Sequence, residues 1–267
     1  MAWRDPRKSR TAGRARLLLG LCLLAAASEV RAVSPLVTDD ADTVEPGKLQ
    51  LNCDFFFYRT ASTSLSSPQI NPVLGLTPRL ELGAIFGYQW RNGSGSTATT
   101  GDAVGITDLT IAPKFRLWQS ADDKLKFSAR MDLKLPTASK RNGLGTGDPD
   151  VGLVGIGTYK LGKTSFDSNL GYYAIDISRP NLDNDRWFIG EAIRHEVNEK
   201  WTIVAEAYGL LPNTSAGGHA TWYFSAGPQW SVRENILVTA LIGSAAGHKS
   251  PAQVRYDEER EAKKRSS

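Results

Sequence analysis

Apolar and polar residues alternate with a period of two through most of this sequence, and this pattern constrains the fold more than any other feature. From 80 to 90 every second residue is apolar: Leu80, Leu82, Ala84, Phe86, Tyr88 and Trp90. The segments 49–57, 125–135 and 220–230 show the same pattern. A helix would instead bring apolar residues to spacings of three and four. These segments are therefore predicted to be β-strands with one apolar and one polar face.

Weaker alternation extends the series to roughly eleven strands, the further ones lying in 70–76, 109–117, 150–160, 166–177, 186–196, 201–210 and 236–244. Most of these segments are about 9 to 13 residues long, whereas strands of globular proteins usually have five or six. A strand that crosses a bilayer needs about 9 to 11 residues. Strand length therefore favours a membrane barrel.

Short and long connections also alternate along the chain. Tight turns are predicted at 77–79, 120–123, 161–164, 198–200 and 233–235, and longer polar stretches lie at 91–103, 137–148, 178–185 and 211–218. Outer-membrane barrels have short turns on one rim and long loops on the other. The alternative is a soluble β-sandwich, whose inner faces would bury the same apolar residues.

The first 32 residues have the pattern of a cleaved secretory signal peptide. A basic region is followed by an apolar run at 17–27, and Val30 and Ala32 supply small residues before the expected cleavage site. The run is shorter than the roughly 18 to 20 apolar residues of a spanning helix. The predicted organisation is a signal peptide at 1–32, a β-barrel at 33–256 and a charged C-terminal tail at 257–267.

The leader also accounts for the positive charge of the chain. The formal net charge is +4, and residues 1–32 contain seven basic and two acidic residues, which leaves about −1 for the rest. Basic composition is therefore no argument for nucleic-acid binding. Of the two cysteines only Cys53 follows the leader, so an internal disulfide is excluded. Beyond the leader no apolar run suits a spanning helix, so crossing a membrane would require a closed barrel.

Five short segments, in order along the chain, resemble one known family. They are 35–47 (PLVTDDADTVEPG), 75–82 (GLTPRLEL), 105–115 (GITDLTIAPKF), 135–137 (LPT) and 169–172 (NLGY). They resemble outer-membrane transporters associated with the meta-pathway of phenol degradation. The resemblance covers about 35 to 250 and implies an outer-membrane β-barrel linked to uptake of hydrophobic or aromatic compounds.

The C-terminal end departs from the usual outer-membrane pattern. Such chains commonly end on a strand with a terminal aromatic residue, but here 247–251 leads through 252–256 into a charged tail. An even number of strands would need one more strand than the pattern supplies. Closure is therefore expected either through the segment near Pro35 or through an altered C-terminus.

Catalytic motifs are weak. His195 and Glu196 resemble the start of a zinc-protease helix but lack the second histidine, and Gly143 to Gly147 resembles a phosphate loop outside any strand-to-helix context. The three histidines, at 195, 219 and 248, are widely separated. We therefore expect no enzyme activity, no metal site and no cofactor.

The polar strand faces supply candidate lumen-lining charges: Asp54, Glu81, Lys114, Arg116, Lys126, Arg130, Asp132, Lys134, Asp150, Glu191, Arg194 and Glu206. One hypothesis is that they form a mixed-charge lining that selects solutes. The alternative is that they pair and fill a narrow barrel structurally. Aromatic residues near strand ends are expected to form interfacial girdles: Tyr58, Trp90, Trp118, Tyr159, Trp187, Trp201 and Trp230.

Together these features predict an all-β, antiparallel, up-and-down transmembrane β-barrel of about 12 strands in the bacterial outer membrane. The expected partners are the lipid bilayer and a small-molecule solute, with no nucleic acid, and a monomer is favoured. The predicted function is a passive, porin-like channel or transporter for small solutes, hydrophobic or aromatic ones among them, gated by 91–103 and 137–148. The alternatives are a non-conducting structural barrel and a soluble periplasmic β-sandwich that binds a ligand.

Overall fold

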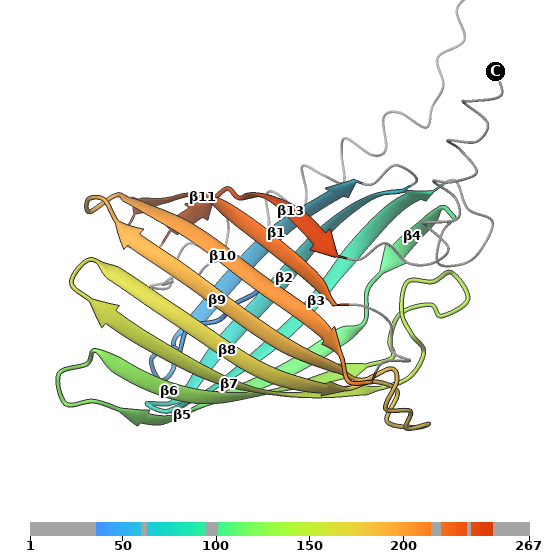
Figure 1. Ribbon diagram of the computed structural model, residues 1–267, viewed down its shortest axis with the longest axis horizontal. Helices are drawn as coiled ribbons and strands as arrows, with labels where there is room; N and C mark the ends of the chain where they lie inside the picture. The colour runs from blue at the N-terminus through green and yellow to red at the C-terminus, as the bar shows by residue number, and fades with distance from the viewer. Residues whose placement is uncertain (1–35, 60–62, 94–100, 215–219, 234–235, 248–267) are drawn as a thin grey trace, which may run out of the picture.

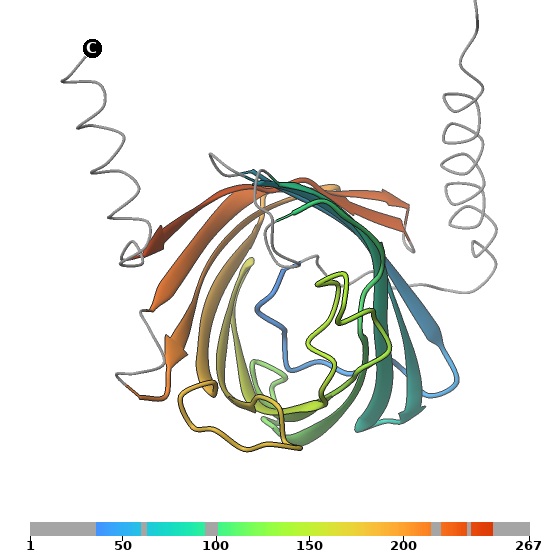
Figure 2. The same cartoon turned by 90° about the vertical axis from the view of Figure 1, so that its right-hand side faces the viewer.

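The structure is a computed structural model that describes residues 36–59, 63–93, 101–214, 220–233 and 236–247. Thirteen strands of these residues form one curled antiparallel sheet (Figures 1 and 2). They are β1 (Leu49–Arg59), β2 (Thr63–Thr77), β3 (Leu80–Gly93), β4 (Ala103–Ile106), β5 (Leu109–Gln119), β6 (Leu125–Leu135), β7 (Asp150–Leu161), β8 (Thr164–Ala174), β9 (Arg186–Glu196), β10 (Trp201–Pro212), β11 (Thr221–Arg233), β12 (Ile236–Thr239) and β13 (Ile242–Gly247). Neighbours in the sheet follow chain order, so the predicted up-and-down barrel is confirmed.

Two positions in the sheet are occupied by broken strands. β4 and β5 both pair with β3, and β12 and β13 both pair with β11. The strand predicted at 236–244 is therefore two short strands, and β4 lies between the loop predicted at 91–103, which it overlaps only at Ala103, and the strand predicted at 109–117. The strands predicted at 125–135 and 186–196 have the observed bounds of β6 and β9.

β2 differs most from its prediction at 70–76. It begins at Thr63 and has 15 residues. Its first half is rich in serine and contains Pro68, so the alternation there is weak. Pairing with β1 on one side and β3 on the other holds this half in the sheet. Pairing with the neighbouring strands determines the structure here, and the local sequence does not reveal this pairing.

The outer surface of the barrel is apolar. Phe55 is 67% exposed and Leu153 is 62% exposed, and exposed aliphatic and aromatic side chains alternate along every long strand. A sandwich would bury these faces between two sheets, whereas here one sheet curls around a polar interior. An apolar outer band suits lipid. Within the described part of the chain, no helix has the length and apolar character needed to span a bilayer.

Aromatic side chains gather at both rims, as predicted. Trp118, Tyr159, Trp201 and Trp230 are exposed near the short turns, where the rings of Trp201 and Trp230 stack at 5.7 Å. Trp90 and Trp187 are exposed near the opposite rim. The side chain of Tyr58 lies outside the described part of the chain. The two bands match the girdles of outer-membrane barrels.

Residues 36–47, named here the N-terminal segment, run inside the barrel (Figure 2). They add no strand to the sheet, so the prediction that the segment near Pro35 closes the barrel is wrong for these residues. Their backbone groups bond instead to lumen side chains. Among the described residues no pairing joins β1 to β12 or β13. The predicted signal peptide, residues 252–256 and the charged tail lie outside the described residues.

Candidate functional site

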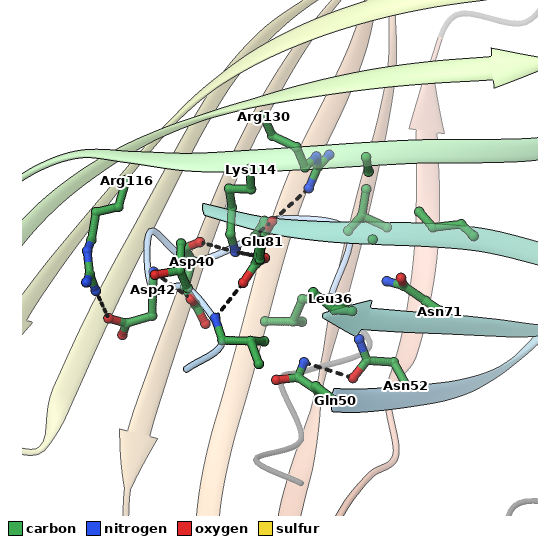
Figure 3. A pocket seen from close by; sticks show the side chains of 18 of the residues that line it. Leu36, Asp40, Asp42, Gln50, Asn52, Asn71, Glu81, Lys114, Arg116 and Arg130 are labelled. Carbon is green, nitrogen blue, oxygen red and sulfur yellow. Dashed lines mark hydrogen bonds and ion pairs between the residues drawn. The ribbon is translucent and has the colours of Figure 1, made fainter. Parts of the chain in front are cut away.

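Most of the predicted lumen charges line one cavity of about 1810 Å³ (Figure 3). These are Asp54, Glu81, Lys114, Arg116, Lys126, Arg130, Asp132, Lys134, Asp150 and Arg194. Glu206 also faces inward, where its carboxylate accepts a 2.6 Å hydrogen bond from the backbone N–H of Thr38. The period of two on each strand carries these side chains to the interior.

Glu191 does not face the lumen, so its predicted position is wrong. On β9 the buried residues are Phe188, Gly190 and Ala192, which puts Glu191 on the outer face with Ile189 and Ile193. Its carboxylate is exposed and accepts a 2.7 Å hydrogen bond from Ser168 on β8. The alternation itself gives the correct face. Charge alone misled the assignment.

Side chains from four strands hold the backbone of the N-terminal segment. Asn169 accepts a hydrogen bond from the N–H of Asp39 at 2.9 Å and donates one to the carbonyl of the same residue at 2.8 Å. Thr158 accepts from the N–H of Ala41 at 2.9 Å, and Ser128 donates to its carbonyl at 2.6 Å. Glu206 accepts a hydrogen bond from the N–H of Thr38, the residue before Asp39. A chain without its own secondary structure thus has its buried backbone groups satisfied.

Asp39 lies between two wall cations. Lys114 is 3.3 Å and Arg130 is 2.9 Å from its carboxylate. The same cations bind wall carboxylates, Lys114 at 3.0 Å from Glu81 and Arg130 at 2.9 Å from Asp132. Burial by itself would raise the pKa of Asp39, but the two cations lower it overall, below its ordinary value.

Asp40 and Asp42 extend this series of ion pairs, Asp40 toward β9 and Asp42 toward the short-turn rim. Arg194 binds Asp40 at 3.0 Å. Lys126 and Lys160 bind Asp42 at 2.5 and 3.2 Å. Burial would raise the pKa of Asp42, but its hydrogen bonds and the charges of Lys126 and Lys160 lower it overall. We name the strands β5 to β9, with these cations, the charged wall.

The N-terminal segment also covers an apolar patch inside the barrel. Ala41 is fully buried against Val154, Ile156 and Phe188, which point inward from β7 and β9. The inward faces of β7 and β9 are therefore apolar at this place. Burying a methyl group stabilises by roughly 0.8 kcal/mol, so packing adds to the hydrogen bonds and ion pairs that dock the segment.

The segment enters past Gly75 on β2. The N–H of Gly47 donates to the carbonyl of Gly75 at 2.8 Å, and the N–H of Gly75 donates to the carbonyl of Lys48 at 3.0 Å. A Cβ at Gly75 would collide with the carbonyl oxygens of Val44 and Glu45. Glycine is therefore required here so that the segment can pass close to the barrel wall.

The opposite side of the cavity carries neutral amides, which we name the amide wall. Its members are Gln50 and Asn52 on β1, Gln69 and Asn71 on β2, and Gln229 on β11. Figure 3 shows Gln50, Asn52 and Asn71 across the cavity from the ion pairs. The Oδ1 of Asn71 and the hydroxyl of Ser67 are buried without a hydrogen-bond partner among the described residues. Asn71 is also one of the residues that line the main cavity.

At the rim with long loops, residues 136–149 fold into the mouth of the barrel (Figure 2). We name them the mouth loop. Arg91 on β3 donates to the carbonyls of Gly143 at 3.0 Å and Asn142 at 3.3 Å. Asp108 accepts from the N–H of Ala138 at 2.9 Å, and Leu144 is buried. The loop is therefore fixed by side chains of the barrel wall.

A second cavity of about 760 Å³ lies beneath the mouth loop. It shares Gln69, Ile85, Thr110 and Lys134 with the main cavity, so the two meet along β2, β3, β5 and β6. The predicted gate at 137–148 corresponds to the mouth loop. The other predicted gate, 91–103, is only partly described, because residues 94–100 lie outside the described part.

Sequence reasoning missed the residues that occupy the lumen. Asp39, Asp40 and Asp42 were used only as part of a family motif. Their signal was visible, since three carboxylates within four residues directly precede a strand series whose polar faces carry lysine and arginine. Arg91 was predicted to lie in a loop because the apolar alternation ends at Trp90, whereas the strand itself continues to Gly93.

The weak catalytic motifs have other positions in the fold. His195 lies on the outer face, where its Nδ1 is 2.9 Å from the hydroxyl of Thr164. Gly143 to Gly147 belong to the mouth loop, and Gly143 has a φ of +62° that favours glycine. Among the described residues no group of three histidine, cysteine, aspartate or glutamate side chains is placed to bind a metal ion.

Comparison with known proteins gives two matches. A family model described as "Putative MetA-pathway of phenol degradation" matches residues 33–251. The crystal structure of an outer membrane channel from Pseudomonas putida F1 superposes with a TM-score of 0.61 at 16% identity, and the match covers 82% of this chain and 94% of that one. No curated protein matches the sequence. The family model thus spans every strand described above, and the solved channel has a related barrel fold.

Proposed function

Because this chain belongs to the phenol MetA-pathway family, we propose that it is a passive outer-membrane channel for small solutes. The observation that carries the proposal is the main cavity of about 1810 Å³ inside a barrel with an apolar outer surface. A barrel of this kind places a polar lumen between two aqueous compartments. The structurally similar protein from Pseudomonas putida F1 is described as an outer membrane channel, which supports the same role.

The solute path in this proposal runs along the amide wall. Ion pairs, the N-terminal segment and buried Ala41 fill the charged wall. The amide wall keeps neutral donors and acceptors beside Phe56, Ile85 and Val73. Neutral hydrogen-bonding groups next to apolar side chains suit small uncharged solutes with an apolar part. The family link to hydrophobic or aromatic compounds agrees with this lining.

Export and orientation follow from the same proposal. Residues 1–32 would act as the signal peptide, and the mature chain would insert as a monomer in the outer membrane. The short turns would face the periplasm and the mouth loop the exterior, as in other outer-membrane barrels. The N-terminal segment would then dock from the periplasmic side, because it enters the lumen at the short-turn rim beside Gly75.

A non-conducting structural barrel is the second candidate, and the docked segment favours it. The segment and the mouth loop both reduce the free cross-section of the lumen. Uptake by liposomes separates the two candidates. Liposomes that contain refolded residues 33–267 should swell in solutions of small neutral solutes, with a rate that falls as solute size rises. A barrel that is folded, as judged by a heat-dependent shift on a denaturing gel, but admits no solute would contradict the channel.

A further inference from the structure

The N-terminal segment changes the charge of the lumen as well as its width. Its carboxylates on Asp39, Asp40 and Asp42 all line the main cavity. The side chain of Asp42 is 36% exposed and that of Asp39 is 18% exposed. Asp39 and Asp42 therefore belong to the surface that a passing ion meets, whereas Asp40, with a side chain only 4% exposed, acts through its charge from a buried position.

Without the segment, the wall charges of the main cavity below the mouth loop cancel in the described residues. Seven cations face inward: Lys114, Arg116, Lys126, Arg130, Lys160, Arg194 and Arg233. Seven carboxylates oppose them: Asp54, Glu81, Asp123, Asp132, Asp167, Glu196 and Glu206. At the mouth, Lys134 pairs with Asp150, and at the short-turn rim Lys48 pairs with Glu45. The wall alone gives no reason to prefer either sign of ion.

Docking of the segment adds three carboxylates and no cation between residues 36 and 44. Four of the wall cations that bind them, Lys114, Lys126, Arg130 and Arg194, already bind wall carboxylates, as Lys114 does with Glu81, and Arg194 with Asp167 at 2.8 Å. The three added negative charges are therefore shared within the cluster and are not neutralised by additional cations. Low-dielectric barrel walls focus such an excess into the lumen.

We propose that Asp39, Asp40 and Asp42 make the lumen cation-preferring, so that the N-terminal segment is the selectivity-determining element of the pore. This inference rests on the proposed channel function. Rings of aspartate and glutamate give cation selectivity in other pores. Here the carboxylates come from one segment laid across the lumen. The barrel wall then holds and orients the selective charges without supplying them.

Asp54 has a separate part in this scheme. It faces the cavity from β1 and has no ion pair among the described residues. It lies on the amide wall, opposite the segment, so a cation in the cavity would have carboxylates on two sides. Asp54→Asn should weaken cation preference less than loss of the three segment carboxylates does.

The test measures the reversal potential of the channel in a planar bilayer under a KCl gradient. The wild type should prefer K⁺ over Cl⁻. Asp39→Asn, Asp40→Asn and Asp42→Asn together should lower the permeability ratio by roughly threefold or more, which corresponds to a change of about one kT in the lumen potential. A matched control, Asp122→Asn with Glu191→Gln and Glu199→Gln, removes three carboxylates outside the lumen and should leave the ratio unchanged.

A second variant covers failure of the triple variant to fold. Lys126→Gln with Lys160→Gln removes both close partners of Asp42 and should move the ratio the opposite way, toward K⁺. Barrel formation is checked for each variant by its heat-dependent gel shift. Conducting channels whose ratio is the same in the wild type and in the variants that fold would overturn the inference. Absence of any conductance in the folded wild type would instead overturn the proposed function.

Discussion

The two walls of the lumen use polar side chains for different purposes. On the charged wall, Arg194 binds Asp40 and Asp167 at once, and little of these side chains is exposed. On the amide wall, Asn71 lines the cavity and has a buried acceptor without a partner among the described residues. The charged wall resembles a protein interior, because its side chains are mostly buried around the N-terminal segment that they hold. The amide wall resembles the surface of a binding site.

This difference shows why a barrel with so many lumen charges can still have a path. The charges of the charged wall pair with the docked segment and stabilise it, whereas the amides of the other wall line the rest of the cavity. The sequence left two interpretations of the lumen residues open: that they fill the barrel structurally, or that they select solutes. The two interpretations therefore apply to different sides of the same cavity. The following experiments test this difference.

The largest effect is expected from Arg194→Met on the charged wall. It leaves Asp40 and Asp167 buried without their cation, and such uncompensated charges cost roughly 3 to 5 kcal/mol. Asn71→Ala on the amide wall removes a group with an unsatisfied acceptor and should cost about 1 kcal/mol or less. Urea unfolding in detergent gives both free energies. Equal losses would mean that the two walls do not differ in the way described.

Conductance should respond in the reverse order. Asn71→Trp places a large side chain on the amide wall and should reduce single-channel conductance to a small fraction of the wild-type value, because the path narrows there. Ile70→Trp, one residue earlier on the same strand and on the outer face, is the matched control and should leave conductance near normal. A channel indifferent to Asn71→Trp must conduct along another wall.

Gly75→Ala should loosen the N-terminal segment. The added Cβ meets the carbonyl oxygens of Val44 and Glu45, so the segment can no longer pass the wall as it does. We expect a moderate rise in conductance and faster proteolysis between 36 and 47. Gly83→Ala, whose Cβ would meet only ordinary contacts at 3.4 Å, is the control. Unchanged proteolysis in Gly75→Ala would show that the segment is held elsewhere.

The smallest effect concerns pH. The pKa values of Asp39 and Asp42 are lowered from 3.8 in the folded barrel. Their contribution to docking is therefore present above about pH 4 and is lost as the pH falls through the lowered values. Protection of residues 36–47 from proteolysis should stay constant from neutral pH down to about pH 5 and decrease only in strong acid. Asp39→Asn with Asp42→Asn should remove that change, and a transition near neutral pH would contradict the assignment.

The sequence predicts the barrel well because period-two alternation is a local signal. It predicts most inward charges for the same reason, as with Lys114 and Arg130. Glu191 was misplaced when charge was given more weight than alternation. The docked segment could not be predicted from local pattern, because residues 36–47 have no periodicity and their positions depend on side chains more than 70 residues away, such as Lys114 and Thr158. The extent of β2 likewise depends on its two neighbours.

Cysteine accessibility tests the two-wall account most directly. With Cys53→Ala as background, Asn71→Cys and Ser128→Cys are compared for reaction with a charged, water-soluble thiol reagent in folded barrels in liposomes. Ser128 is 1% exposed beneath Ala41, so its replacement should stay unlabelled until Gly75→Ala loosens the segment, whereas the cysteine at position 71 should react at once. Equal labelling at both positions, or none at position 71, would contradict an open amide wall facing a filled charged wall.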